Sequence, residues 1–212
     1  MNGRERLQPY LGIDRIACLY HRAEKSFAEK KLPAHGWDHV YRDIINAVLI
    51  GEQEKANMDI VLPAMILHDI GFLYDPNPSV HNRIGAEMCR EWLTEWNEEE
   101  KQRIARCILV HKGKMREFTM EPENLEENVV CDADMLEKVG WLGVLQAVRV
   151  FVEFAENGKP EYFELYNLAT TIAKVKSVSF YTAAGRRLAA ERGGYLRADV
   201  CQKALQELEF YR

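Results

Sequence analysis

Apolar residues recur at spacings of three and four along most of the chain, which is the periodicity of helices with one buried face. Over about residues 10–31 this stripe consists of Ile13, Ile16, Ala17, Tyr20, Ala23 and Phe27. No stretch alternates convincingly between apolar and polar residues every two positions, as a half-buried strand would. The pattern therefore predicts an all-α fold.

Proline and glycine residues divide this pattern into separate helices. Pro33 and Gly36 interrupt it early, Gly71 is placed to end a helix, and residues 75–79 form a proline-containing loop. An exposed loop is expected over about 112–124. The predicted helices cover about residues 10–31, 38–54, 59–70, 80–95, 98–110, 125–137, 141–156, 162–191 and 198–211.

Length and composition narrow the classes of protein. A chain of 212 residues, 47% apolar and 29% charged, fits one globular domain, and we predict a single domain over residues 1–212. The net charge of −5 argues against extended nucleic acid as a partner, because nucleic-acid phosphates need clustered Lys and Arg. A small phosphorylated substrate, met by a few local cations, remains compatible with it.

The sequence favours a cytoplasmic protein with no membrane partner. The apolar run over residues 60–67 is far too short to span a bilayer, and the N-terminus lacks the order of a signal peptide. The five cysteines are scattered, odd in number and never spaced as C-x-x-C. We therefore expect reduced thiols and no thiolate metal site.

A histidine–aspartate pair, His68-Asp69, interrupts the apolar run Ile66-Leu67-His-Asp-Ile70-Gly-Phe-Leu73. Burying an ionised carboxylate without a partner is costly, so Asp69 needs a metal ion or a buried Arg or Lys. The adjacent imidazole favours the metal, because imidazole and carboxylate are ordinary ligands of transition-metal ions. The alternative is an aspartate bonded to backbone at a helix end, with His68 as a core residue.

Other candidate ligands are weaker signals when taken singly. Asp132 and Asp134 interrupt a second apolar stretch, but on a helix they point about 200° apart, so only one should face the site of His68. His39 lies in the first turn of its helix, with Arg42 and Asp43 on the same face one turn on. His81 opens a helix and His111 ends another, and side chains at helix ends can reach a shared cleft.

In their order, these residues resemble the HD-domain superfamily of metal-dependent phosphohydrolases, which is named for its adjacent His-Asp pair. The matching segments are Asp38-His39-x-x-Arg42, Leu67-His68-Asp69-Ile70-Gly71 and Asp132-Ala133-Asp134-x-Leu136. The resemblance covers about residues 35–140. It implies a compact all-α core of about five helices around a metal site, here followed by additional C-terminal helices over about 141–212.

The resemblance also implies which residues bind metal. One or two divalent ions are expected, drawn from Mn, Fe, Zn, Ni, Co and Mg. The ligands of the first would be His39, His68, Asp69 and Asp134. His81 and His111 look like the two extra histidines of the dinuclear branch, in which Asp69 would bridge the ions. Whether one ion or two bind stays open.

The catalytic roles follow less directly. We expect three catalytic residues, Asp69, Arg42 and Lys112. The two cations would stabilise phosphoryl charge, and Arg83 and Lys138 are further candidates, because each of these four cations lies within a turn of a proposed ligand. Asp38 or Asp132 could orient the ligand histidines, and His35 is expected to be structural or at the cleft rim. Some nucleotidase members carry an acidic residue where this chain has Phe72, so the general base stays open.

These features predict a metal-dependent phosphohydrolase that acts on a phosphoester or pyrophosphate, with a nucleotide or related small molecule as substrate. Two alternatives remain. One is a di-iron oxygenase of the HD-domain type, since the six candidate ligands are present. The other is a non-catalytic sensor that binds a nucleotide. The sequence leaves the oligomeric state open, homo-oligomers included.

Overall fold

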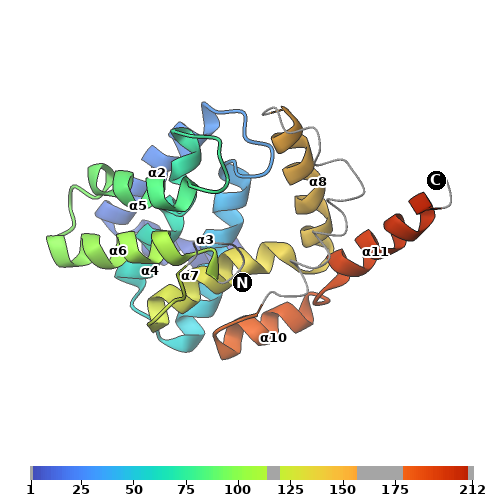
Figure 1. Ribbon diagram of the computed structural model, residues 1–212. Helices are drawn as coiled ribbons and strands as arrows, with labels where there is room; N and C mark the ends of the chain where they lie inside the picture. Colours follow the sequence, from blue (N-terminus) through green and yellow to red (C-terminus); the bar gives the residue numbers. More distant parts are fainter. Residues whose placement is uncertain (1, 114–119, 157–178, 210–212) are drawn as a thin grey trace.

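The computed structural model describes residues 2–113, 120–156 and 179–209, and within these segments all regular structure is helical (Figure 1). The predicted all-α fold is therefore confirmed. The α-helices are α1 (Gly3–Leu11), α2 (Asp14–Ala28), α3 (Trp37–Glu54), α4 (Met58–Leu67), α5 (His81–Trp92), α6 (Glu98–Val110), α7 (Leu125–Met135), α8 (Gly140–Glu156), α10 (Ala183–Glu191) and α11 (Leu196–Glu209). Two short 3-10 helices, η1 (Ile70–Leu73) and η3 (Leu136–Lys138), follow α4 and α7.

Asparagine side chains fix where several of the central helices begin. Asn97 accepts a hydrogen bond from the Glu100 amide at 3.0 Å, and the Glu100 carboxylate accepts one from the Asn97 amide at 2.9 Å. This reciprocal pair caps the first turn of α6. The side chains of Asn57 and Asn124 also accept a hydrogen bond from a backbone amide, at the starts of α4 and α7.

Helix α4 lies at the centre of the core. Every residue from Ile60 to Leu67 is buried, so this helix is apolar on all sides. Helices α2, α3, α6 and α7 pack around it, and α5 packs against α6 and η1. The polar residues at the end of α4, His68 and Asp69, are therefore carried into the interior by the burial of the helix before them.

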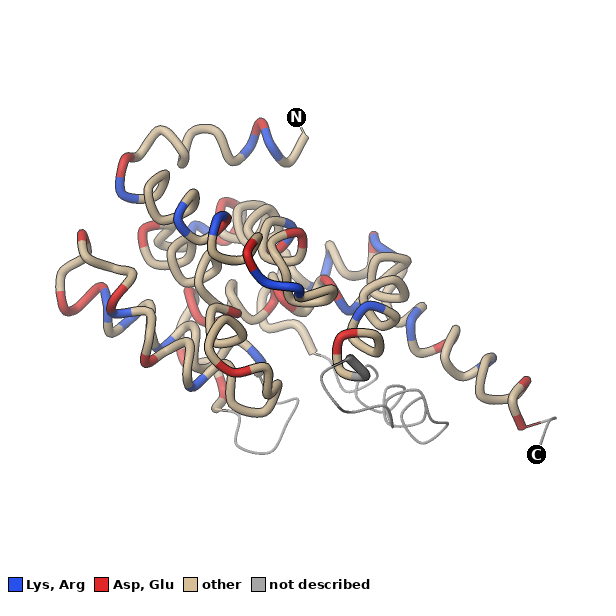
Figure 2. Tube along the Cα trace, turned by 90° about the horizontal axis from the view of Figure 1, so that it is seen from above, with Lys and Arg blue, Asp and Glu red and all other residues tan. Residues whose placement is uncertain are grey.

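The C-terminal helices lie to one side of this core (Figure 1). Helix α10 packs against α3 and α7, and α11 packs against α8. Lys and Arg are interspersed with Asp and Glu along the described helices (Figure 2). Among the described residues, every helix is too short or too polar to serve as a membrane span.

The structure changes some predicted helix boundaries. The helix predicted over about 10–31 corresponds to the shorter α2, which begins at Asp14 and ends at Ala28, and the helix α1 before it was not predicted. Helix α4 ends at Leu67, and Gly71 lies inside η1, so it is not the helix-ending glycine that we expected. The predicted loop over 112–124 and the predicted helix over 162–191 fall partly outside the described residues, and within that predicted helix residues 179–182 are not helical, so α10 begins at Ala183.

Candidate metal centre

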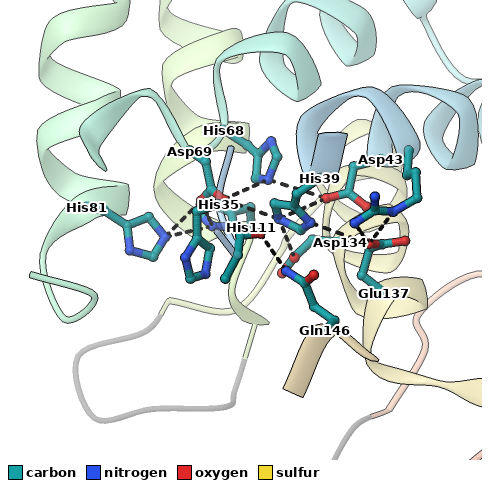
Figure 3. Close-up of polar contacts among 12 residues, drawn as sticks. His35, His39, Asp43, His68, Asp69, His81, His111, Asp134, Glu137 and Gln146 are labelled. Carbon is teal, nitrogen blue, oxygen red and sulfur yellow. Dashed lines mark hydrogen bonds and ion pairs between the residues drawn. The ribbon is translucent and has the colours of Figure 1, made fainter. Parts of the chain in front are cut away.

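The six side chains predicted as metal ligands lie together in the protein interior (Figure 3). They lie on or directly after five successive helices, between residues 39 and 134, and each side chain is buried. His39 is on α3, His68 and Asp69 follow α4, His81 begins α5, His111 follows α6, and Asp134 is on α7. The tertiary structure therefore brings the whole predicted set to one place.

A glycine allows two of these segments to approach each other. A Cβ atom placed on Gly71 would lie 2.0 Å from the carbonyl oxygen of His81, far inside contact distance. Only a residue without a side chain fits there. Gly71 thus permits η1, which follows Asp69 directly, to meet the first residue of α5.

Three of the histidines are oriented by backbone carbonyls three residues earlier. The Nδ1 atoms lie 2.8 Å from Met65 O for His68, 3.0 Å from Pro78 O for His81 and 2.7 Å from Ile108 O for His111. A carbonyl oxygen only accepts, so each Nδ1 carries the proton and donates it. In its neutral form, each ring then presents the lone pair of Nε2 to the interior, as a metal-binding histidine does.

Asp69 lies between two groups of histidine nitrogens. Its Oδ2 atom is 3.2 Å from His39 Nε2 and 3.4 Å from His68 Nε2. Its Oδ1 atom is 3.1 Å from His81 Nε2 and 3.7 Å from His111 Nε2. The two oxygens of one carboxylate therefore face different histidine pairs.

The remaining ligand candidate, Asp134, lies on the side of His39. Its Oδ1 atom is 3.8 Å from His39 Nε2, and its Oδ2 atom accepts a hydrogen bond from Lys138 Nζ at 2.7 Å. Burial opposes ionisation of Asp134, but the Lys138 ammonium and the nearby histidines outweigh it and lower the pKa. Asp134 is thus held as a carboxylate beside the histidines.

The donor atoms fit a metal ion better than they fit one another. His68 Nε2 and Asp69 Oδ2 are buried, and within the described segments neither has a hydrogen-bond partner. The Nε2 atoms of His81 and His111 are 3.2 Å apart although both rings donate through Nδ1, so two lone pairs face each other. A cation between such atoms removes the repulsion, and nitrogen and oxygen donors suit Mn, Fe, Co, Ni or Zn.

Protons are a poor substitute for that cation on one side of the cluster. Burial lowers the pKa of His81 to about 4, and burial together with the neighbouring histidines holds the pKa of His111 well below its ordinary value. Burial also opposes ionisation of Asp69, but the imidazoles around it outweigh burial and hold its pKa well below the usual range. Neutral imidazoles beside an ionised carboxylate are the protonation states that a metal ion requires.

The cluster also contains Asp43, which our sequence-based ligand set did not include. Asp43 is fully buried on α3, and its Oδ2 atom is 3.2 Å from His39 Nε2 and 3.5 Å from His68 Nε2. The signal was present in the sequence, because Asp43 follows His39 by one helical turn on the same face. Ligand atoms of His39, Asp43, His68 and Asp134 lie within 4.8 Å of one another, as do those of Asp69, His81 and His111.

Besides Lys138, which bonds Asp134, two further candidate phosphoryl-binding cations lie beside the cluster. Arg42 donates through Nε to Glu137 Oε2 at 2.7 Å, and Glu137 is also 3.6 Å from His39 Nδ1. Lys112 is buried, and its Nζ atom donates to Pro78 O at 2.8 Å and to Asn82 Oδ1 at 2.7 Å. Lys112 and His81 thus share the Pro78 carbonyl as an acceptor.

Arg83, another candidate cation, lies elsewhere. Its guanidinium is exposed and pairs with Glu87 on the same helix, at 3.2 Å. The side chain of Asp38 is also largely exposed and lies 3.9 Å from Arg149. The contacts found for Arg83 and Asp38 are therefore with surface charges and not with the ligand histidines.

Asp132 holds the C-terminal segment. Its carboxylate accepts hydrogen bonds from the Tyr181 amide at 2.9 Å, the Thr182 amide at 2.8 Å and the Thr182 hydroxyl at 2.6 Å. Thr182 is in turn the N-cap residue of α10. The expectation that Asp132 orients a ligand histidine is wrong, because its oxygens are used by residues 50 positions along the chain.

His35 lies at the edge of the cluster and is fixed by α8. Its Nδ1 atom donates to Glu153 Oε1 at 2.5 Å, and Glu153 Oε2 accepts from the Ala34 amide at 2.8 Å. Phe72 stacks between the rings of His35 and His81, with centroid distances of 4.3 and 4.1 Å. Phe72, which stands where some nucleotidases have an acid, therefore supports His81 by packing.

Comparison with known proteins agrees with this arrangement. A family model of the HD domain matches residues 36–138. The uncharacterized protein YpgQ of Bacillus subtilis (strain 168) is 31% identical to the chain over 116 residues. That alignment covers 53% of this chain and 55% of YpgQ, so it spans about half the length of each protein.

Solved structures resemble the chain over most of its length. A predicted HD superfamily hydrolase from an uncultured Thermotogales bacterium superposes with a TM-score of 0.58 at 21% identity, covering 90% of this chain and 91% of that one. A Lactobacillus plantarum protein gives 0.63 at 19% identity, covering 93% and 96%. YpgQ in complex with ADP gives 0.58 at 20% identity, covering 93% and 95%.

These likenesses agree with the helical arrangement, and the family match includes the residues of the cluster. Residues 36–138 contain His39, the His68-Asp69 pair and Asp134 in the order that suggested the family from the sequence alone. Residues 36–138 therefore match the HD domain, and the buried cluster lies within this match.

Proposed function

We propose that this protein is a divalent-metal-dependent phosphohydrolase that acts on a phosphoester or pyrophosphate bond of a nucleotide or a related small molecule. The observation that carries the proposal is the position of Asp69, whose two oxygens each face a pair of histidine Nε2 atoms. Such a carboxylate is placed to be shared by two ions. Hydrolytic sites with two metal ions about 3.5–4 Å apart are common among phosphatases.

The ligand set that we propose follows the two sides of Asp69. One ion would be held by His39, His68, Asp69 and Asp134, and a second by Asp69, His81 and His111. A bound divalent ion would lower the pKa of a coordinated water from about 15.7 toward about 7 and would polarise a phosphoryl oxygen.

The chain's own residues would then orient the ligands and offset substrate charge. Glu137 lies 3.6 Å from His39 Nδ1, beyond hydrogen-bond distance, and is itself held by Arg42, so this pair would act on the His39 ring through its charge. The Arg42 side chain is 26% exposed, so a substrate would have partial access to it. Lys112 is a second phosphoryl-binding candidate. Contact with substrate would replace its hydrogen bonds to Pro78 O and Asn82 Oδ1.

A nucleotide substrate is supported by a relative. YpgQ, which is 31% identical over the aligned half of the chain, has been solved in complex with ADP. The likeness to an HD superfamily hydrolase supports hydrolysis as the reaction class. A screen of substrates identifies the base and the bond that is cleaved.

The test is a metal-supplemented screen of phosphoesters and nucleotides on the purified protein. Metal content would be measured first, and release of phosphate and pyrophosphate would then be followed after adding Mn²⁺, Fe²⁺, Co²⁺, Ni²⁺, Zn²⁺ or Mg²⁺. We expect His68→Ala and Asp69→Ala to lower kcat/KM by more than about 100-fold, since even residues that only orient ligands contribute 10–100-fold. Asp59→Asn, an exposed carboxylate paired with Arg15, is the control and should be unaffected.

Unchanged metal content and activity in both cluster variants would contradict the proposal. Binding of ADP without turnover of any substrate, across all the metals, would favour a nucleotide sensor instead.

A second candidate function is favoured by the completeness of the six-residue cluster. HD-domain proteins with this ligand pattern include oxygenases that use two irons, and His81 and His111 are in place beside Asp69. Oxygen consumption coupled to cleavage of a substrate, seen with Fe²⁺ and not with Mg²⁺, would favour this function over hydrolysis.

A further inference from the structure

Asp43 is a buried carboxylate aimed at the metal-binding nitrogens. It lies on α3 one turn after His39, and none of its surface is exposed. Its Oδ2 atom is 3.2 Å from His39 Nε2 and 3.5 Å from His68 Nε2, and it has no hydrogen-bond partner within the described part of the chain. Figure 3 shows its side chain directed toward the same region as His39 and His68.

The chemistry of these neighbours suits a cation between them. His68 donates its Nδ1 proton to Met65 O, so a neutral His68 turns the lone pair of Nε2 toward Asp43 Oδ2. Two electron-pair donors 3.5 Å apart repel each other in a dry interior unless a positive charge lies between them. Asp43 and His68 therefore meet as two ligands of one ion would.

The other oxygen of Asp43 is held in place by a chain of hydrogen bonds. Asn46 Nδ2 donates to Asp43 Oδ1 at 3.3 Å and to the Ala133 carbonyl at 3.1 Å. Arg192, at the end of α10, donates to Asn46 Oδ1 at 2.8 Å. Metal-binding carboxylates are commonly oriented by such outer partners, which leave one oxygen free for the ion.

We propose that Asp43 is a direct ligand of the divalent ion that His39, His68 and Asp134 hold. This proposal rests on the metal centre put forward above. It adds Asp43 to the donors His39, His68 and Asp134, besides the shared Asp69. The ion at this position would then have three carboxylates (Asp43, Asp69 and Asp134) and two imidazoles. The ion beside His81 and His111 would have fewer carboxylates.

An oxygen-rich donor set has a consequence for metal preference. Carboxylate oxygens suit Mn²⁺ and Mg²⁺, whereas imidazole-rich sites suit Zn²⁺, Cu²⁺ and Ni²⁺. We therefore expect removal of the Asp43 carboxylate to weaken Mn²⁺ binding more than Zn²⁺ binding. The position of Arg192 also makes α10 part of the support of the metal centre.

The experiment measures metal binding in the full chain without any substrate. Metal-free protein would be titrated with Mn²⁺, and free Mn²⁺ would be followed by its electron paramagnetic resonance signal. Asp43→Asn should bind Mn²⁺ at least about 10-fold more weakly than the parent protein, or lose one equivalent of bound ion. Asp43→Glu, which restores a carboxylate, should recover part of the affinity, and Asp59→Asn should match the parent.

Thermal unfolding of the same proteins separates ligation from a structural role. For a ligand, Asp43→Asn leaves the melting temperature of the metal-free protein unchanged or higher, because a buried carboxylate facing lone pairs is removed, and it reduces the rise that Mn²⁺ causes. Asp43→Ser is a second neutral variant with a smaller side chain, and it should also bind Mn²⁺ more weakly than the parent protein.

The outcomes distinguish this proposal from the proposed function. If both neutral variants bind Mn²⁺ with parental stoichiometry and within threefold of parental affinity, while His68→Ala does not, Asp43 is not a ligand although the metal centre stands. If His68→Ala also binds Mn²⁺ normally, the metal centre itself is wrong. A loss of Mn²⁺ binding in Asp43→Asn supports ligation even if no phosphoester is hydrolysed.

Discussion

At the scale of single residues, backbone carbonyls determine which ring nitrogen three of the histidines direct into the cluster. The carbonyls of Met65, Pro78 and Ile108 each accept from the Nδ1 atom of the histidine three residues later. The Nε2 atoms are thereby free before any ion arrives, which reduces the reorganisation that metal binding requires. His35 differs, because its Nδ1 atom is held by a carboxylate, Glu153, from another helix.

Glu153 offers a test at the scale of one residue. We expect Glu153→Gln to lower the free energy of unfolding by about 1.5–3 kcal/mol at pH 7, because a buried carboxylate that accepts from His35 and two backbone amides is lost. Burial opposes ionisation of Glu153, but the hydrogen bonds from His35 and the amides outweigh it and lower its pKa in the folded state.

The pH dependence follows from that direction. A carboxyl with a lowered folded-state pKa stabilises the protein above its unfolded pKa, about 4.3, and loses this contribution as pH falls through the folded value. The difference between the parent and Glu153→Gln should therefore be full at pH 7 and shrink below about pH 4.3, as measured by urea unfolding. A difference that grows on acidification would contradict the assignment. Glu87→Gln, at an exposed ion pair, is the control.

At the scale of secondary structure, the centre is built from helix ends. His68 and His111 lie at the C-terminal caps of α4 and α6, and His81 is the first residue of α5. Side chains there extend beyond their helix into the space between elements, so five helices can contribute without crowding. This arrangement depends on how closely η1 and α5 can approach, which Gly71 decides.

Gly71→Ala tests the approach of these two elements. Its Cβ atom would lie 2.0 Å from the His81 carbonyl oxygen, which belongs to backbone and cannot rotate away. We expect a loss of about 1–3 kcal/mol in stability and weaker binding of the ion beside His81, measured by urea unfolding and Mn²⁺ titration. Gly12→Ala, at a helical backbone angle with 3.3 Å to its nearest neighbour, should change stability far less. Equal effects in the two variants would contradict this role for Gly71.

At the scale of the whole molecule, the segments outside residues 36–138 support the HD domain from one side. Helix α8 fixes residues 34 and 35 through Gln146 and Glu153. Helix α10 is attached through Asp132 at its start and through Arg192 and Asn46 at its end. The C-terminal helices thus contact both carboxylate-bearing helices of the centre, α3 and α7.

The two aspartates of α7 should therefore respond differently to substitution. Asp132→Ala should lower stability by about 1.5–3 kcal/mol, because hydrogen bonds to residues 181 and 182 are lost from a charged acceptor. Its Mn²⁺ affinity in the folded state should stay within threefold of the parent. Asp134→Ala should instead weaken Mn²⁺ binding by more than about 10-fold. Unfolding curves and Mn²⁺ titrations check both, and reversed effects would exchange the two roles.

The sequence by itself determined the helical class, most helix boundaries and the order of residues that marks an HD domain. It could do so because helical periodicity is local and because a histidine–aspartate pair inside an apolar run needs a partner. Helix α1 was missed, since Leu7 is the one buried residue of this helix and its apolar periodicity is weak. Only the tertiary structure could assign different partners to Asp132 and Asp134, because Thr182 is 50 residues from Asp132 and His39 is 95 residues from Asp134.

Tertiary structure alone also brought Asp43 into the cluster. Its position one turn after His39 was visible in the sequence, but a surface carboxylate would have the same spacing. What decides its role is that α3 is packed against α4 and α7, so that the face carrying both residues is buried against His68 and Asp69. Spacing along a helix fixes which side chains share a face, whereas packing decides whether that face meets water or the other residues of the cluster.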